Sequence, residues 1–283
     1  MNHYLVGLII TGLVLFSCRE NKREPIIKLE DIYAWCIVPF DQLDRSPSER
    51  IKMLKELVIT KYAYDWRKED LPFMAEELTL AKKNKVDVIA VWMWIDDNWD
   101  SLEQLNESNE KVFEVIENIA YKGQLWVSFN ANYFENLSDV DAVKKGADMI
   151  ALLSKRAATL DCKVALYNHG DWFGEPENLL KIIEALPNED LGLVYNFHHA
   201  HAQIERFPKL VKMMLPYLWN VNLNGLIKEG PKILPVGEGE YEKEMIDLLI
   251  KNGYTGDFGI LGHVENADVK TILEANIKGL KNI

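Results

Sequence analysis

The sequence predicts an α/β protein of the (β/α)8 barrel class, and three observations support this. Short apolar runs alternate with helical patterns along the chain, which is typical of a parallel sheet with helical crossovers. The alternation occurs eight times, and eight strand–helix units favour closure into a barrel over an open doubly wound sheet. The chain has 283 residues with 48% hydrophobic content, and a barrel of this class typically needs about 250 residues.

The expected elements follow from the apolar runs and from the helix signals between them. Strands are expected at residues 31–40, 57–66, 86–95, 124–131, 163–168, 191–196, 218–223 and 257–261. Helices are expected at residues 46–57, 70–85, 108–120, 140–160, 177–186, 204–214, 243–252 and 268–280. Two helix starts are supported by Pro47 and Pro72, because proline suits the first turn, where an N–H has no partner within the helix. No linker to a second domain interrupts the alternation.

Charge and cysteine content exclude some functions. The formal net charge is −12, and binding to nucleic acid needs basic patches, so no nucleic-acid partner is expected. Three cysteines are too few for a disulfide framework. Cys36 and Cys162 lie in apolar runs, where a cysteine usually acts as a small buried hydrophobe.

The sequence of the N-terminus predicts a sorting signal. Residues 1–17 contain no Asp, Glu, Lys or Arg, and residues 4–16 form an apolar run of signal-peptide length that ends at Ser17-Cys18. This end resembles a bacterial lipobox, whose cysteine is acylated and becomes the first mature residue. We therefore expect a lipoprotein signal at 1–17, lipidation of Cys18, a charged tether at 18–28 and the barrel at 29–283. The domain would lie in the cell envelope, in the periplasm or on the outer-membrane surface. An uncleaved membrane anchor is the alternative.

Histidines and asparagines gather after the last four expected strands. In parallel α/β barrels, side chains at the C-terminal ends of the strands build the active site. Five of the six histidines in the chain occur in this set. Because side chains alternate along an extended segment, His198 and His199 are expected to face opposite directions. The set consists of Asn168, His169, Asn196, His198, His199, His201, Asn222, Asn224 and His263.

The first four expected strands end in aromatic side chains beside polar ones. Trp92 is one of these, and a tryptophan beside polar groups suits a sugar, whose C–H face stacks on the ring. The alternative is that the rings only plug the mouth of the barrel. Lys61 is expected at a strand end, paired with Asp65 or Asp96, because an unpaired lysine is costly to desolvate.

Two acidic segments supply candidate acids and bases. Trp172 and Glu175 follow the fifth expected strand, and Glu238 and Glu240 lie in the loop before the seventh expected helix. A glutamate in a water-poor pocket can act as a general acid or base.

The motifs at these strand ends carry a family resemblance. They are YNHGDWFGEPEN after the fifth strand, VYNFHHAH, VNLNG and the C-terminal NGYTGDFGILGH. From about Asp31 to Leu280 the chain resembles the xylose isomerase-like TIM barrel family. More narrowly it looks like a subgroup described as sugar phosphate isomerase/epimerase-like proteins, which are often exported. The resemblance implies a (β/α)8 TIM barrel acting on a small-molecule carbohydrate.

Metal-dependent members of this family hold a divalent ion with Glu, Asp, His and Glu at the ends of the fifth to eighth strands. In this sequence the matching positions hold Tyr167, Asn196, Asn222 and Leu261. None of these is the standard ligand, so no metal and no other cofactor is expected at the usual site. A relocated site for Mn²⁺, Mg²⁺, Co²⁺ or Zn²⁺ would use His198, His201 and either Glu238 or Glu240.

The first functional hypothesis is an enzyme that removes a proton next to a carbonyl of a carbohydrate. Isomerases, epimerases and lyases acting on keto-sugars share this step, and donors hold the enolate oxygen. The predicted acid–base groups are His198 with Glu238 or Glu240, supported by His169, His201 and Lys61. The predicted substrate-binding residues are Asn168, Asn196, Asn222, Asn224, Trp172, Glu175, Trp92 and His263.

The second hypothesis is a carbohydrate-binding lipoprotein that kept the pocket of the barrel and lost its chemistry. The loss of every standard metal ligand favours this alternative. The density of histidine and glutamate favours the enzyme, because a binding protein would not need them. The oligomeric state and the sugar remain undetermined at this point.

Overall fold

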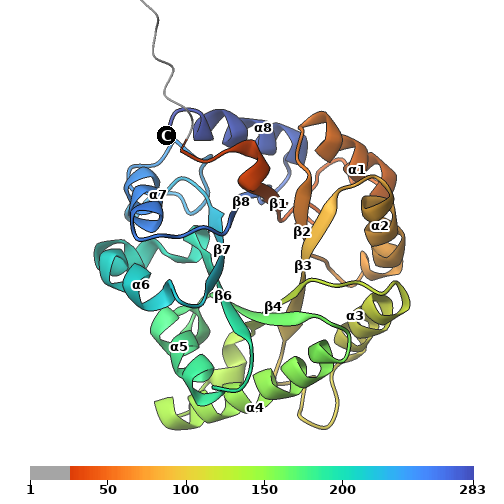
Figure 1. Cartoon of the computed structure of the whole chain (residues 1–283), viewed down its shortest axis with the longest axis vertical. Helices are drawn as coiled ribbons and strands as arrows, with labels where there is room; N and C mark the ends of the chain where they lie inside the picture. Colours follow the sequence, from red (N-terminus) through yellow and green to blue (C-terminus); the bar gives the residue numbers. More distant parts are fainter. Residues whose placement is uncertain (1–25) are drawn as a thin grey trace, which may run out of the picture.

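The computed structural model describes residues 26–283, which form one closed parallel barrel with strands in the order β1 to β8. The predicted α/β (β/α)8 TIM barrel is confirmed. Figure 1 shows the helices as a ring outside the strands. The strands are β1 (Ile32–Trp35), β2 (Lys61–Tyr64), β3 (Asp87–Ile95), β4 (Gln124–Phe129), β5 (Lys163–Tyr167), β6 (Leu191–Asn196), β7 (Leu218–Leu223) and β8 (Asp257–Leu261).

Each strand is followed by a helix on the outside of the barrel, as the alternation predicts. The helices are α1 (Pro47–Glu56), α2 (Leu71–Lys83), α3 (Glu107–Asn118), α4 (Asp139–Ala158), α5 (Pro176–Ala185), α6 (Phe207–Met214), α7 (Glu242–Lys251) and α8 (Val269–Leu280). The sixth helix starts later than expected, because residues 201–206 form the 3-10 helix η5 before Pro208 opens α6. Ser46 caps α1 through a capping box with Glu49.

Large and small side chains alternate inside the barrel. Trp126 and Tyr167 stack with their ring centroids 6.1 Å apart, and Ala63, Ala90 and Ala165 line the same interior. In β8, Gly259 has no room for a side chain, since a Cβ there would lie 2.2 Å from Asn222 Oδ1. This space lets the Tyr33 hydroxyl donate a 2.7 Å hydrogen bond to Asn222 Oδ1 across the interior. The core is thus packed up to the level of the strand ends.

The prediction for Lys61 is wrong. Lys61 is the first residue of β2, so it lies at the N-terminal end of the barrel rather than among the strand ends that follow the sheet. Its Nζ donates 2.8 Å hydrogen bonds to both carboxylate oxygens of Asp257, the first residue of β8. The strand had been expected to begin at residue 57, and the late start of β2 moves Lys61 to the opposite end.

The expected sorting signal and Cys18 lie outside the described residues. Within residues 26–283, no helix is long and apolar enough to cross a membrane. Cys36 and Cys162 are both buried, as their apolar surroundings predict.

Candidate active site at the C-terminal end of the barrel

Residues at the ends of six strands, or in the segments that follow them, meet in a cavity of about 80 Å³ at the C-terminal end of the barrel, here called the inner cavity. Its position is where catalytic residues occur in barrels of this class. Five predicted site residues line it: Trp92, His169, Asn196, His198 and His263. The sequence analysis did not assign a role in the site to the other lining residues, which are Trp35, Cys36, Phe40, Asp65, Arg67, Tyr167 and His199.

Asp65 is the buried carboxyl group of the inner cavity. It is the first residue after β2, and only 2% of its surface is exposed. Its Oδ1 accepts hydrogen bonds from the backbone N–H groups of Ile37 (3.2 Å) and Val38 (3.3 Å), which follow β1. Cys36 has a left-handed backbone (φ 56°) immediately before these two donors. The second oxygen, Oδ2, is buried with no hydrogen-bond partner among the described residues.

The environment of Asp65 suits proton transfer. Burial raises its pKa from 3.8 to about 7, although the backbone N–H of Val38 and the charge of Arg67 act in the opposite direction. A carboxyl group with a pKa near neutrality is present as both acid and base at working pH, which is what general acid–base catalysis requires. Asp65 is therefore the best-placed proton-transfer group in the cavity.

Four histidines form a second cluster that lines the inner cavity. The ring centroids of His169 and His199 are 4.4 Å apart, those of His198 and His199 are 4.6 Å apart, and those of His198 and His263 are 5.5 Å apart. The expectation that His198 and His199 face opposite directions is wrong. Residues 197–199 form the 3-10 helix η4, so the alternation of an extended strand does not apply.

The histidines of this cluster are held neutral. Burial lowers the pKa of His169 to about 4, of His263 to about 4 and of His199 to about 2, and it also lowers the pKa of His198. Neighbouring histidines add to the effect, since a second positive charge so close is unfavourable. At neutral pH these rings can donate an N–H to an oxygen without carrying a charge, as a neutral imidazole does when it polarises a carbonyl.

Tyr167 presents its hydroxyl at the centre of a hydrogen-bonded network. The oxygen accepts hydrogen bonds from Trp35 Nε1 (3.2 Å) and from the Asn196 side-chain amide. The Asn196 Oδ1 in turn accepts from the backbone N–H of His198 (3.0 Å). With both of these contacts made as acceptor, the Tyr167 O–H proton remains available to a ligand oxygen in the cavity.

The residues present do not fit the divalent ion of the resembled family. Tyr167 and Asn196 lie at the ends of β5 and β6 and bond to each other, Asn222 accepts from Tyr33, and Leu261 is an apolar core residue at the end of β8. Oxygen-preferring cations are held chiefly by carboxylates. Within residues 26–283, no group of three His, Cys, Asp or Glu side chains is arranged to hold a metal ion, so the relocated set of His198, His201 and Glu238 or Glu240 is not found as such a group.

Three predicted acid–base residues lie outside the inner cavity. The side chains of Glu238 and Glu240 are exposed on the loop before α7 and do not line it. His201 bonds to the backbone carbonyls of Ile227 (3.2 Å) and Lys232 (3.1 Å), so it holds the loop after β7. These glutamates are not brought together with His198, and the expectation of a shared acid–base set is not met.

Several predicted substrate-binding residues have structural partners instead. The Trp172 ring packs on Phe134 with centroids 4.6 Å apart, and Glu175 pairs with Arg206. Asn168 is buried and its Oδ1 accepts a 2.7 Å hydrogen bond from the backbone of Asn196. Asn222 and Asn224 are also buried and do not line the inner cavity; Asn224 donates to Gly225 O (2.8 Å).

The most important residue that the sequence analysis missed as a site residue is Asp65. It had been considered only as a partner for Lys61. A signal was present, because Asp65 is the first polar residue after the buried run of β2. Its carboxyl group could have been placed beside the histidines if the end of β2 had been assigned correctly.

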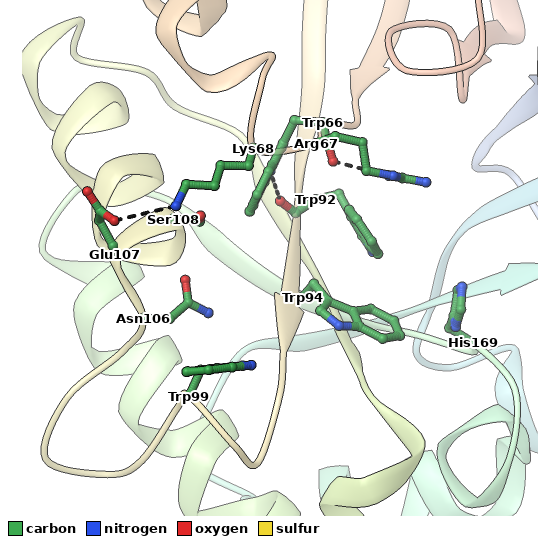
Figure 2. A pocket seen from close by; sticks show the side chains of 10 residues that line it. All are labelled: Trp66, Arg67, Lys68, Trp92, Trp94, Trp99, Asn106, Glu107, Ser108 and His169. Atoms are coloured by element: carbon green, nitrogen blue, oxygen red, sulfur yellow. Dashed lines mark hydrogen bonds and ion pairs between the residues drawn. The ribbon is translucent and has the colours of Figure 1, made fainter.

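A larger hollow, here called the outer groove, opens beside the inner cavity and has a volume of about 740 Å³ (Figure 2). Arg67, Trp92 and His169 line both spaces, so the two are neighbours that share these side chains as a wall. The outer groove is lined by four tryptophans and by polar side chains: Trp66, Trp92, Trp94, Trp99, Arg67, Lys68, Asn106, Glu107, Ser108 and His169. Figure 2 shows the Trp94 ring next to His169, and the two rings meet edge to face with their centroids 4.9 Å apart.

The fold defined above is that of the parallel (β/α)8 barrels with a site at the C-terminal strand ends, and solved structures share it. The apo structure of a 3-keto-D-glucoside 4-epimerase from E. coli matches with a TM-score of 0.69 and 14% identity, covering 89% of this chain and 99% of that one. The probable 3-DHS dehydratase AsbF, involved in petrobactin synthesis, from Bacillus anthracis matches with a TM-score of 0.68 and 14% identity, covering 88% and 98%.

A third structure carries the name of the resembled family. A xylose isomerase-like TIM barrel protein from Mycobacterium smegmatis, in complex with magnesium, matches with a TM-score of 0.55 and 12% identity, covering 88% of this chain and 96% of that one. The resemblance drawn from the sequence is thus confirmed for the fold. No family model matches the chain, and no curated protein matches it.

Proposed function

We propose that this protein is an enzyme of the xylose isomerase-like group that removes a proton next to the carbonyl of a carbohydrate, without the divalent ion of its metal-dependent relatives. The observation that carries the proposal is the unpartnered Asp65 Oδ2, which lies buried in a cavity lined by neutral histidines and Tyr167. The fold neighbours include a sugar epimerase and a dehydratase, and both names are consistent with this class of chemistry.

The proposed step uses several of the residues that line the inner cavity. The Asp65 carboxylate takes the proton from the carbon next to the carbonyl, and the electron pair of that C–H bond moves to the carbonyl oxygen. The N–H of a neutral histidine, of which His169 and His199 are candidates, and the O–H of Tyr167 stabilise the resulting enolate. Return of a proton to the other face of the same carbon gives an epimer. Return of a proton to the former carbonyl carbon, with transfer of a hydroxyl proton from the neighbouring oxygen to the former carbonyl oxygen, gives an isomer. Loss of a β substituent with its bonding electrons makes the enzyme a lyase.

The alternative function is a carbohydrate-binding protein without catalysis. Its support is the replacement of the family's metal ligands by Tyr167, Asn196, Asn222 and Leu261. The buried carboxyl group argues against it, because a binding site gains nothing from an unpaired Asp65 oxygen, whose burial is costly.

The experiment that tests the proposal compares Asp65→Asn with Asp257→Asn. The first variant keeps an oxygen for the Ile37 and Val38 amides but removes the acid–base group, whereas the second makes the same change at the opposite end of the barrel. With D-fructose and methyl 3-keto-D-glucoside as probes, Asp65→Asn should lower kcat by about 10²- to 10⁴-fold. The Asp257→Asn variant should turn over like the wild type.

Three outcomes would decide between the functions. Equal turnover by Asp65→Asn and the wild type would reject Asp65 as the proton-transfer group. Binding of sugars without any turnover by the wild type would favour the binding protein. Loss of turnover after chelator treatment, with elemental analysis showing one divalent ion per chain in the untreated protein, would reject the metal-independent step.

We also propose that the domain is lipid-anchored in the cell envelope through Cys18. The support is the apolar run at residues 4–16 and its abrupt change to charged residues after Cys18. Mass spectrometry of the mature protein should find a diacylated N-terminal cysteine, and Cys18→Ser should remove the acyl group and release the protein from the membrane fraction. A mature chain that begins at Met1 would contradict the signal.

A further inference from the structure

The outer groove combines tryptophan rings with polar side chains, a composition that suits a sugar ring. One of these tryptophan side chains is unusually exposed. Trp99 has 71% of its surface exposed to solvent, which is high for a tryptophan side chain. It lies in the loop between β3 and α3 and lines the groove, and Figure 2 shows it close to Asn106. An exposed aromatic ring that lines a groove has apolar area available for a ligand.

The loop that carries Trp99 is anchored rather than free. The neighbouring residue, Asp100, is only 4% exposed, and its carboxylate accepts hydrogen bonds from the backbone N–H groups of Asp96 (3.0 Å) and Asn106 (2.8 Å). It also accepts from the side-chain amides of Asn106 (2.8 Å) and Asn109 (3.1 Å). The backbone beside Trp99 is therefore held in place before any ligand arrives, which lowers the entropic cost of ordering the loop on binding.

The volumes of the two spaces indicate how a substrate would be divided between them. Whole ligand sites usually measure about 300–1,000 Å³. The inner cavity, at about 80 Å³, lies below this range, whereas the outer groove, at about 740 Å³, lies within it. Only the reacting edge of a sugar would fit beside Asp65, and the remainder would extend past Trp92 and His169 into the outer groove.

The lining of the outer groove favours a second sugar over a phosphate or a purely apolar group. Trp92 and Trp94 present tilted rings with centroids 5.5 Å apart, suited to C–H faces. Polar side chains border these rings and can serve hydroxyl groups; one pair, Lys68 and Glu107, has its charged atoms 3.7 Å apart. Arg67 and Lys68 also line the groove, but the charge of Lys68 is paired with Glu107, whose carboxylate would repel a phosphate. Glu107 and Asn106 together disfavour an apolar group.

We propose that the outer groove binds the second ring of a glycoside, so that the substrate is a disaccharide or the end of an oligosaccharide rather than a free monosaccharide or a sugar phosphate. The proposal rests on the proposed function for the reacting ring, and it adds Trp99 as a specificity-determining residue. The reacting sugar places its carbonyl edge against Asp65, and the glycosidic bond leads the next ring along Trp94 to Trp99.

The test measures a ratio of affinities by calorimetry. Each member of a panel of glucose, galactose and mannose disaccharides is paired with the methyl glycoside of its non-reducing sugar. In the wild type, at least one disaccharide should bind ten or more times as tightly as its methyl glycoside. Trp99→Ala should lower this ratio about tenfold, since stacking on an aromatic ring is worth about that much in affinity.

The matched control is Leu102→Ala. Leu102 lies in the same loop, is 49% exposed and does not line the outer groove. The Leu102→Ala variant should keep the wild-type ratio, because it removes exposed apolar area from the loop without changing the lining of the outer groove. A ratio that falls equally in both variants would show a disturbed loop and overturn the role of Trp99.

Other outcomes separate this inference from the proposed function. A wild-type ratio near one, a ratio retained in Trp99→Ala, or no binding across the panel would overturn the disaccharide site. Turnover of keto-sugars, measured in parallel, decides the proposed function independently. A disaccharide preference without turnover would leave this site standing and reject the chemistry.

Discussion

The two ends of the barrel use the same kinds of side chain to different effect. At the N-terminal end, Lys61 pairs with Asp257 across the ends of β2 and β8, and both carboxylate oxygens are satisfied. At the C-terminal end of the same β2, Asp65 has one satisfied oxygen and one without a partner among the described residues. Of the histidines in the same cavity, His263 has its Nε2 3.8 Å from a carboxylate oxygen of Glu265.

This difference shows that the C-terminal end of the barrel contains polar groups that reduce the stability of the folded state. Among the described residues, buried polar atoms without a hydrogen-bond partner occur after the strands at Asp65, Asn132, Asn168 and Asn224, and elsewhere at Asn109, Ser154, Glu177, Asn220 and Asn222. Each such atom has a desolvation cost that a fully paired arrangement would avoid. Barrels of this class tolerate such costs at the C-terminal end because that end carries the chemistry, whereas the other end mainly provides stability. Substitutions at the two ends of the barrel should therefore differ in their effects on stability and on turnover.

The largest effect is expected for the stability of Asp65→Asn as a function of pH. The folded-state pKa of Asp65 is raised, so the folded protein binds a proton more tightly than the unfolded chain, and stability is lost as pH rises from about 4 to about 7. The free-energy advantage of Asp65→Asn over the wild type should grow by about 4 kcal/mol across this range, at about 1.36 kcal/mol per pKa unit. Urea unfolding at pH 4 and pH 8 measures it, and a pH-independent difference would contradict the buried carboxyl group.

A slightly smaller effect of opposite sign is expected for His199→Gln. The folded-state pKa of His199 is lowered to about 2, so the unfolded chain takes up a proton below pH 6.5 while the folded protein does not. The wild type should therefore lose stability as pH falls, by about 3 kcal/mol at pH 4 from this residue. The variant should lack that loss in the same urea series. An equal loss in both proteins would mean that His199 is charged or exposed.

A small effect is expected at the other end of the barrel for Lys61→Met. The Lys61 and Asp257 side chains are 27% and 28% exposed, so their ion pair is screened by solvent. The free energy of unfolding should change by less than about 1 kcal/mol. Turnover should stay within twofold of the wild type, whereas a tenfold fall would place Lys61 in the chemistry after all.

The smallest effect is expected for Glu238→Gln. This side chain is exposed on the loop before α7, so neither kcat nor sugar affinity should change by more than about twofold, as is usual for surface substitutions. Steady-state kinetics and calorimetry on the same preparation check both quantities. A large loss of turnover with intact binding would show that Glu238, as predicted from the sequence, is the proton-transfer group in place of Asp65.

The fold could be predicted because periodicity and chain length depend on local sequence. The apolar runs located all eight strands, and the polar residues after β5, β6 and β8 brought His169, His198 and His263 to the inner cavity. The errors in the predicted site arose where the boundaries of strands were misplaced. Because β2 was expected to begin at residue 57, Lys61 was predicted at the wrong end of the barrel. Because residues 197–199 form a 3-10 helix, His199 lines the cavity instead of facing away from it.

Other parts of the site depend on contacts between distant segments. The backbone N–H groups of Ile37 and Val38 hold Asp65 across 28 and 27 residues of sequence, which no local pattern reveals. The exposure of Trp99 likewise depends on how Asp100 anchors its loop. Glu238 and Glu240 were attractive as a charged motif, but their exposure is a property of the folded loop.

The measurement that tests the central claim most directly is hydrogen exchange between a keto-sugar and solvent. The wild type and Asp65→Asn are incubated in D₂O with methyl 3-keto-D-glucoside, and NMR follows deuterium uptake at the carbons next to the carbonyl. Proton abstraction by Asp65 predicts enzyme-dependent uptake by the wild type and a loss of about 100-fold or more in the variant. Equal uptake by both proteins, or no uptake above the uncatalysed rate, would contradict it.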